Sequence, residues 1–429
     1  MLYHLHEYHR TLLEPATRWA EATARLFSPP DGWLAHWPGA SHLAAGYELL
    51  YRLGKRYDKP PFGIESVQAQ GVRVAVLEET VLAKPFCRLL RFSRCSDRPE
   101  LIDRLNADSP VLVVAPLSGH HATLLRETVA TLLTNHTVYV TDWLDARLVP
   151  LADGPFSLDD YVAYIREFVR HIGADGLHVL AVCQPAVPVL AAAALDAAAG
   201  EPAPLSLILM GGPIDARQSP TRVNQFATTR PLRWFETHLV HETPHGYPGR
   251  GRRVYPGFLQ HAGFIAMNPG RHLSAHLEFY EDVARGAHDD AQEHRRFYDE
   301  YNAVLDMLAE YYLDCIRVVF QQHLLPRGLW RVDGELVEPA AISDTALMTV
   351  EGELDDISGL GQTRAALDLC TGVPAERKRH LMVPGAGHYG IFSGRRWREI
   401  VYPRVRDHIA AAESQYRMST SVFLRSSAK

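Results

Sequence analysis

One cysteine lies where a short apolar strand gives way to an alanine-rich helix. Cys183 follows the run Leu177-His-Val-Leu-Ala-Val182 and precedes Pro185 and an alanine-rich segment. A sharp strand-to-helix turn projects its central side chain from the sheet, as in the nucleophile elbow, whose usual pattern is Gly-x-Ser-x-Gly. Here Ala181 and Pro185 replace both glycines, but alanine adds one methyl group and proline is tolerated in the first turn of a helix. The start of a helix favours a thiolate, so the pattern predicts a cysteine nucleophile.

The role of Cys183 depends on partners, because a single cysteine can equally be an inert buried thiol. In enzymes with this elbow, the acid follows a late strand and the histidine follows the last strand. Asp355 lies in an acidic turn after an apolar strand, and His388 lies in a glycine-rich loop after the last expected strand. We therefore predict a triad of Cys183, His388 and Asp355. Asp356 and Glu353 compete for the position of the acid, and a solvated acidic turn is the alternative.

An attack on a carbonyl carbon also needs backbone N–H donors for the developing oxyanion. One donor is normally the residue after the nucleophile, which is Gln184 here, and the other comes from the loop after an early strand. We assign this second donor to Leu117 or Ser118. His120 and His121 follow in the same loop, but without a further ligand set we interpret them as polar loop residues. We expect neither a metal nor a bound cofactor.

The elements that must position these residues alternate between short apolar strands and helical stretches, which is typical of a parallel sheet covered on both faces. Two strands between 72 and 92 suggest an opening hairpin. Buried strands are then expected at 111–115, 137–141, 177–182, 205–210, 346–350 and 380–383, with helices at 158–172 and 188–199. This order predicts an α/β-hydrolase fold with a mostly parallel central sheet.

The regular spacing breaks after residue 213, and roughly 130 residues pass before the next core strand, far more than a crossover requires. This segment combines many aromatic residues with helix formers. It is expected to be a large helical cap over the sheet, in which the aromatics either contact substrate or form a core of their own. The predicted organisation is an N-terminal helical segment (1–65), a first part of the core (66–214), the cap (215–343), a second part of the core (344–415) and a tail (416–429).

Composition restricts the possible functions. The 429 residues can bury a large core, and a net charge of −6 argues against a nucleic-acid partner. No apolar run reaches the ~18 residues that a membrane span needs, and the first residues lack the pattern of a secretory signal. We therefore expect an intracellular protein that is not transmembrane. The five scattered cysteines suggest reduced thiols, and the basic run at 250–253 is expected to be solvated surface.

The same residues resemble the intracellular polyhydroxybutyrate depolymerases, and the resemblance extends from the N-terminal helices to near the C-terminus. It rests on Met1-Leu-Tyr-His-Leu-His-Glu7, Val182-Cys183-Gln-Pro185, Gly352-Glu-Leu-Asp355-Asp-Ile357 and Pro384-Gly-Ala-Gly-His388-Tyr-Gly390. That family is in turn similar to the polyhydroxyalkanoate synthases, which also use an elbow cysteine.

The resemblance implies that Cys183, Asp355 and His388 are catalytic and that the substrate is storage polyester in cytoplasmic granules. The granule surface is the implied partner, and assembly into a homo-oligomer is left open. Products would be 3-hydroxybutyrate or oligomers, released from a thioester by water or, as a cosubstrate, by coenzyme A.

Two rival functions remain. One is a hydroxyacyl-CoA-dependent acyltransferase of the synthase kind. The elbows of the synthases are closer to the glycine-flanked pattern, whereas this chain has Ala181 and Pro185 at the flanking positions. The other is a granule-associated protein without activity, which the three triad candidates in the expected order argue against.

Overall fold

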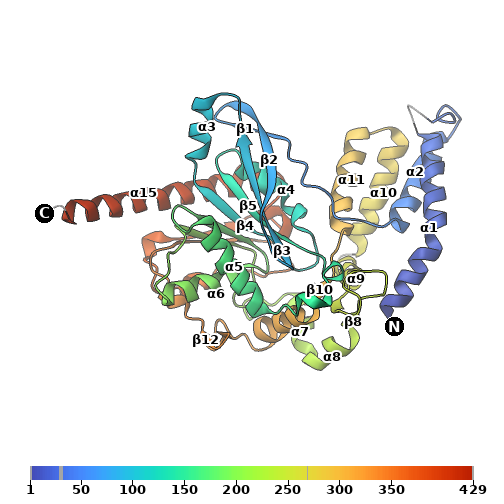
Figure 1. The fold of residues 1–429 in the computed structure, drawn as a ribbon. Helices are drawn as coiled ribbons and strands as arrows, with labels where there is room; N and C mark the ends of the chain where they lie inside the picture. Colours follow the sequence, from blue (N-terminus) through green and yellow to red (C-terminus); the bar gives the residue numbers. More distant parts are fainter. Residues whose placement is uncertain (1, 29–31, 268, 428–429) are drawn as a thin grey trace.

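The predicted strands, joined by one more at the edge, form a central sheet of nine strands (Figure 1). The computed structural model describes residues 2–28, 32–267 and 269–427. The strands of the sheet are β1 (Ser66–Ala69), β2 (Val72–Ala83), β3 (Cys87–Cys95), β4 (Pro110–Val114), β5 (Thr137–Trp143), β6 (His178–Val182), β7 (Ser206–Met210), β13 (Ala346–Gly352) and β14 (Lys378–Val383).

The order of these strands is β1-β2-β3-β5-β4-β6-β7-β13-β14. From β5 to β14 each strand runs parallel to its neighbours, whereas β1, β2 and β3 pair antiparallel and β3 also pairs antiparallel with β5. The predicted α/β-hydrolase fold is confirmed, and so is the opening hairpin, which β2 and β3 form.

Helices cover both faces of the sheet, and successive strand residues point to opposite faces. In β6, Val179 and Ala181 belong to the core cluster under α5 and α6, whereas Leu180 and Val182 belong to the cluster under α4 and α15. β6 is therefore buried along its whole length, which explains its unbroken apolar run. The core helices are α3 (Pro99–Asn106), α4 (Arg126–Leu132), α5 (Leu158–Ile172), α6 (Ala186–Ala198), α13 (Ala365–Leu369), α14 (Gly394–Arg396) and α15 (Tyr402–Ser427).

The segment between β7 and β13 is mainly helical, as the sequence predicts. Its helices are α7 (Arg222–Thr229), α8 (Leu232–His238), α9 (Gly257–Met267), α10 (Pro269–Arg285), α11 (His288–Asn302) and α12 (Ala309–Asp314), the last continued by a π-helical turn at Cys315–Gln321. It also contains short strands that the sequence did not indicate. β8 (His241–Glu242), β9 (Arg253–Tyr255) and β10 (Met307–Leu308) form a small sheet, and β11 (Arg331–Val332) and β12 (Glu335–Leu336) form a hairpin.

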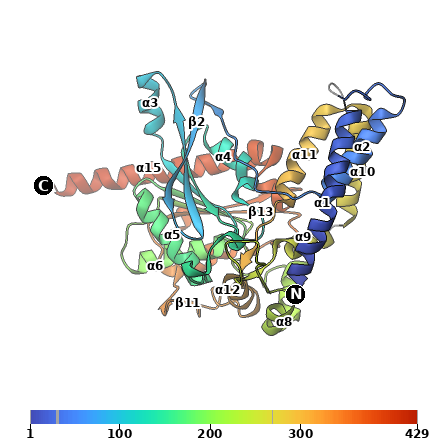
Figure 2. The same ribbon diagram turned by 45° about the vertical axis from the view of Figure 1, so that its right-hand side comes forward.

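The N-terminal helices α1 (Leu2–Phe27) and α2 (Ala40–Gly54) pack against the cap. Together with α10 and α11 they form a helical bundle beside the sheet, in which α1 is the outermost helix (Figures 1 and 2). Arg52 of α2 pairs with Asp299 at 3.0 Å, and Glu48 of α2 pairs with Arg295 at 2.6 Å. The two N-terminal helices thus extend the cap rather than the core, α2 through direct ion pairs and α1 through its packing on α2.

The last helix leaves the body of the protein. α15 covers the sheet at its beginning and then projects outward (Figure 1), and it continues to Ser427, through most of the segment expected as a tail. The last two residues of that segment lie outside the described residues. Among the described residues, no helix is both long and apolar enough to cross a bilayer.

Candidate active site

Cys183 occupies a strained turn between β6 and α6. Its φ is +68°, in the left-handed region that a non-glycine residue rarely adopts. The turn is held because the Cys183 N–H donates to the Met210 carbonyl at 2.7 Å and its carbonyl accepts from the Ala186 N–H at 3.1 Å. The side chain is half-buried and lines a cavity. Strain of this kind persists only where the surroundings fix it, and it is concentrated at functional sites.

The room for this turn comes from a glycine elsewhere in the chain. At Gly212, just after β7, an added Cβ would lie 2.2 Å from the Ala186 Cβ and 2.7 Å from the Cys183 carbonyl oxygen. Pro185 has φ −56°, which suits the start of α6. The elbow thus dispenses with the two usual flanking glycines, while the neighbouring strand end supplies the glycine that close packing requires.

His388 and Asp355 meet as the sequence order predicts. The His388 Nδ1 is hydrogen-bonded to the Asp355 Oδ2 at 2.8 Å, and both side chains are buried. The other carboxylate oxygen of Asp355 accepts the N–H groups of Ile357 and Ser358 at 2.9 Å each. Glu353, one competitor for the acid, instead accepts from the Gly385 N–H at 2.7 Å. The bond to His388 distinguishes Asp355 within the acidic turn.

The surroundings of His388 favour its charged form. Burial by itself lowers the pKa of His388, but the negative charges of Cys183 and Asp355, and hydrogen bonds to both, raise that pKa well above 6.5. A positively charged imidazole stabilises a neighbouring thiolate, which is the nucleophilic form of cysteine. The start of α6 adds a favourable dipole on the same side.

The loop that should carry the second oxyanion donor is fixed at both ends. Ala115, where the loop begins, donates its N–H to the Thr141 Oγ1 at 2.9 Å, and its carbonyl accepts from the Trp143 Nε1 at 2.9 Å. At the far end, the Gly119 carbonyl accepts from the Leu305 N–H at 2.7 Å. The candidate donors Leu117, Ser118 and Gln184 all line the same cavity as the cysteine.

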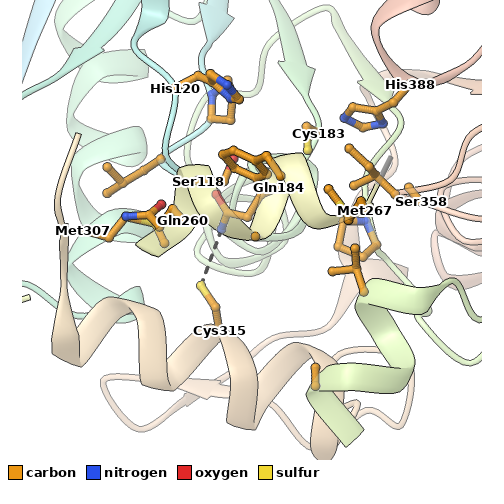
Figure 3. Close-up of a pocket in the computed structure, with 18 of the residues that line it drawn as sticks. Ser118, His120, Cys183, Gln184, Gln260, Met267, Met307, Cys315, Ser358 and His388 are labelled. Atoms are coloured by element: carbon orange, nitrogen blue, oxygen red, sulfur yellow. Dashed lines mark hydrogen bonds between the residues drawn. The ribbon is translucent and has the colours of Figure 1, made fainter. Parts of the chain in front are cut away.

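Cys183 and His388 open into a cavity of about 550 Å³ between the strand ends and the cap (Figure 3). The walls are mostly apolar. Cap side chains contributing to them include Phe226, Phe264, Met267, Met307, Tyr312 and Ile316. The cap's aromatics fall into two groups, since Phe264 and Tyr312 line the cavity whereas Phe279 and Trp330 are buried in packing.

Several cavity residues carry no sequence signal. The Gln184 side chain points across the cavity and its Nε2 donates to the Cys315 Sγ at 3.7 Å (Figure 3). Gln260 donates to the Tyr255 and Leu305 carbonyls at 2.8 and 3.1 Å, which places its amide over the loop at Gly119. Gln260 and Cys315 belong to an insertion without motifs, so only the folded chain identifies them as cavity residues.

His120 is engaged within the fold. Its Nε2 is hydrogen-bonded to the Tyr301 carbonyl at 3.1 Å, its ring stacks on Phe264 with ring centroids 4.8 Å apart, and burial lowers its pKa to about 4. Within the part of the chain that the structure describes, no cluster of three potential metal ligands occurs.

The prediction of a solvated basic run is wrong for Arg252. This side chain is buried, and it donates to the carbonyls of Val149 and Gly154 at 2.9 and 2.8 Å and also to that of Pro150. A guanidinium can be buried where carbonyl oxygens satisfy its N–H groups, as they do here.

The sheet order, the elbow at the end of β6 and the histidine after the last strand define an α/β hydrolase. Residues 211–413, just under half of the chain, match the family model described as PHB de-polymerase C-terminus. This match supports a protein of the polyhydroxybutyrate depolymerase type and, with it, a carboxylic ester hydrolase. No curated protein sequence is similar enough to the chain to count as a relative.

Solved structures resemble the chain only distantly. A putative lipase from Acinetobacter baumannii AYE is 12% identical, with 79% of this chain and 93% of that chain covered and a TM-score of 0.46. A 2-hydroxy-6-oxo-6-phenylhexa-2,4-dienoate hydrolase from Rhodococcus sp. strain RHA1 is 14% identical, with 79% and 99% covered and a TM-score of 0.43. At these TM-scores the likenesses support no conclusion of their own.

Proposed function

We propose that the chain is an intracellular poly(3-hydroxybutyrate) depolymerase that cleaves ester bonds of granule polyester through an acyl-thioester on Cys183. The observation that carries the proposal is the buried hydrogen bond between His388 and Asp355, with His388 and Cys183 side by side in the wall of one apolar cavity. The depolymerase-type domain that contributes two of these residues supports the same substrate.

The first half of the reaction forms the thioester. The Cys183 sulfur attacks the ester carbonyl carbon, and the oxyanion accepts hydrogen bonds from the N–H of Gln184 and from that of Leu117 or Ser118. As the C–O bond breaks, the charged His388 gives its Nε2 proton to the leaving alkoxide, which departs as the hydroxyl end of the shortened polymer. Asp355 keeps the imidazole oriented and stabilises its charge.

The second half releases the acyl group. His388, now neutral, takes a proton from water while the water oxygen attacks the thioester carbonyl, and the C–S bond breaks to return the thiolate. The product is a free 3-hydroxyacid or a short oligomer. A thioester also transfers its acyl group readily to another thiol, so coenzyme A could replace water and give a hydroxyacyl-CoA. Neither route needs a metal or a bound cofactor.

The apolar cavity supports a neutral aliphatic substrate. Its lining is dominated by aliphatic and aromatic side chains of the cap, with few charged groups. Ester chains without charge lose little hydration on entering such a site, whereas a charged substrate would require partners there.

The test uses protein-free amorphous poly(3-hydroxybutyrate) particles, incubated with and without coenzyme A. The wild type is compared with Cys183→Ala and with the control Cys95→Ala, which removes an exposed thiol on β3. Released 3-hydroxybutyrate, oligomers and hydroxybutyryl-CoA are quantified by mass spectrometry. We expect product from the wild type and from the control but none from Cys183→Ala.

Each of the other possible outcomes would refute the proposed mechanism or favour one of the two rival functions. Equal product from all three proteins would refute a cysteine nucleophile. Polymer formed from hydroxybutyryl-CoA would indicate the synthase-like acyltransferase. Particle binding without any product would indicate a granule-associated protein.

A further inference from the structure

The outer face of α1 is an apolar stripe that the rest of the described protein leaves exposed. Of the 26 residues in this helix, only Tyr3, Ala20 and Ala24 are buried. Four large apolar side chains recur every seven residues, and a tyrosine lies one turn after the first of them. These residues, the α1 stripe, are Leu5, Tyr8, Leu12, Trp19 and Leu26, with 38% to 62% of their surface exposed. Since α1 is the outermost helix of its bundle, the stripe is open to a partner (Figures 1 and 2).

The charges of α1 cancel within the helix. It contains three glutamates and three arginines, and each forms an ion pair with another residue of α1. The pairs are Glu7–Arg10 at 2.5 Å, Glu14–Arg18 at 2.5 Å and Glu21–Arg25 at 2.6 Å. Helices that bind anionic lipid carry an excess of lysine and arginine. A neutral helix with an apolar outer face instead complements an uncharged surface.

A second copy of the chain fits the stripe poorly. Paired helices with a seven-residue repeat are specified by opposite charges on both sides of the seam. The flanking positions here carry no carboxylate, and Pro15 interrupts the seam where a side chain should interlock. The flanking residues are His4, Thr11, Arg18 and Arg25 on one side and His9, Ala16 and Thr23 on the other.

The stripe begins beside the candidate active site. His6 of α1 stacks on Phe258 of α9, with ring centroids 4.0 Å apart and an interplanar angle of 7°. About one and a half to two and a half turns further along α9, Phe264 and Met267 line the cavity that contains Cys183. A surface held against α1 is therefore held near the helix that borders the cavity.

We propose that the α1 stripe is the face by which the protein lies on amorphous aliphatic polyester. The choice of polyester rests on the proposed function, while the stripe, its neutral charge and its continuity with α9 are independent of it. An insoluble polymer cannot diffuse into the cavity, so an enzyme acting on it gains from a second contact that keeps the cavity near the surface.

The test pairs Leu5→Gln with Leu12→Gln in one variant of the full chain. The matched control pairs Leu77→Gln on β2 with Leu329→Gln before β11, two leucines exposed to a similar extent, 51% and 52% against 49% and 59%. Binding to protein-free poly(3-hydroxybutyrate) particles is measured by co-sedimentation. Turnover of a soluble 3-hydroxybutyrate trimer and the molar mass in solution are measured in parallel.

We expect the stripe variant to bind particles at least tenfold more weakly, with turnover of the trimer within twofold of the wild type, and the control to bind normally. Particle binding that the stripe variant retains in full would overturn the proposal. A fall in molar mass on mutation would overturn it in favour of a second copy, and equal stripe-dependent binding to anionic phospholipid vesicles would overturn it in favour of a membrane. Stripe-dependent binding by a protein that cleaves neither trimer nor particles would support the docking face while refuting the proposed function.

Discussion

Replacing Asp355 by asparagine removes the negative charge of the candidate acid and keeps its shape. The two N–H groups of Ile357 and Ser358 hold one carboxylate oxygen, so the asparagine oxygen is expected to take that position and its NH2 group to face the His388 Nδ1. A donor on that side forces the imidazole proton onto Nε2, the nitrogen that has to accept a proton during catalysis.

The expected fall in kcat/KM follows from the interactions that Asp355→Asn removes. A buried hydrogen bond to a charged partner, such as the 2.8 Å bond between His388 and Asp355, contributes about 1.5–3 kcal/mol. The wrong tautomer adds to this loss, and in a serine triad the corresponding substitution lowers kcat by about 10⁴. We expect kcat/KM for Asp355→Asn to fall by about 10² to 10⁴, equivalent to ~3–5 kcal/mol. The pKa of His388 should also fall, because the charge of Asp355 helps to raise it.

The assay follows acid release from a soluble 3-hydroxybutyrate trimer at constant pH, with circular dichroism to show that the variants fold. Asp356→Asn is the matched control, since it removes the same charge from the adjacent position. Retention of activity within threefold by Asp355→Asn would refute the reasoning. A comparable loss in Asp356→Asn would show that the acidic turn acts as a whole and not through one residue.

Two further predictions concern stability. Gly212→Ala should lower the free energy of unfolding by about 1–3 kcal/mol, because the added Cβ would lie 2.2 Å from the Ala186 Cβ and 2.7 Å from the Cys183 carbonyl oxygen. Urea unfolding would compare this variant with the control Gly246→Ala, where an added Cβ has no neighbour within 4 Å. Equal stabilities of the two variants would contradict the account of the elbow. The pKa of Glu413 is lowered to about 2 by the His178 imidazole, whose Nε2 lies 3.6 Å away, and by a hydrogen bond from the Ser109 hydroxyl at 2.6 Å. The stabilisation from this carboxylate is therefore complete above pH ~4.5 and is lost as pH falls towards 2. Glu413→Gln should therefore cost on the order of 1 kcal/mol at pH 7, after allowance for partial exposure, and this difference should disappear near pH 2; a difference independent of pH would rule out the charge as its cause.

Local patterns in the sequence were sufficient for the core elements. Helix α5 spans Leu158–Ile172, as predicted, because a serine cap, an apolar stripe and a following glycine all lie within its own segment. The strand before Cys183 could also be predicted from its own segment, because a strand that is buried on both faces needs an unbroken apolar run. The short hairpin of β11 and β12 was missed although Asp333-Gly334 is a typical turn pair for one.

The acidic turn shows where local patterns fail. The turn could equally have been a solvated one, yet Glu351 is buried and accepts the N–H groups of Gly361, Thr363 and Arg364. Arg252 is a second such case. Whether a charged side chain faces water or backbone groups depends on segments far away in the sequence, which a local pattern does not contain.

The sequence by itself determined the class of fold, the insertion and the order of the candidate nucleophile, acid and histidine, because each depends on residues within one element or on the order of elements. Only the tertiary structure decided that Asp355 holds His388, that Gly212 makes room for Cys183, that cap side chains wall the cavity and that α1 packs with the cap. Each of these depends on contacts between residues far apart in the sequence, whose energies are small and act only once the whole chain has folded.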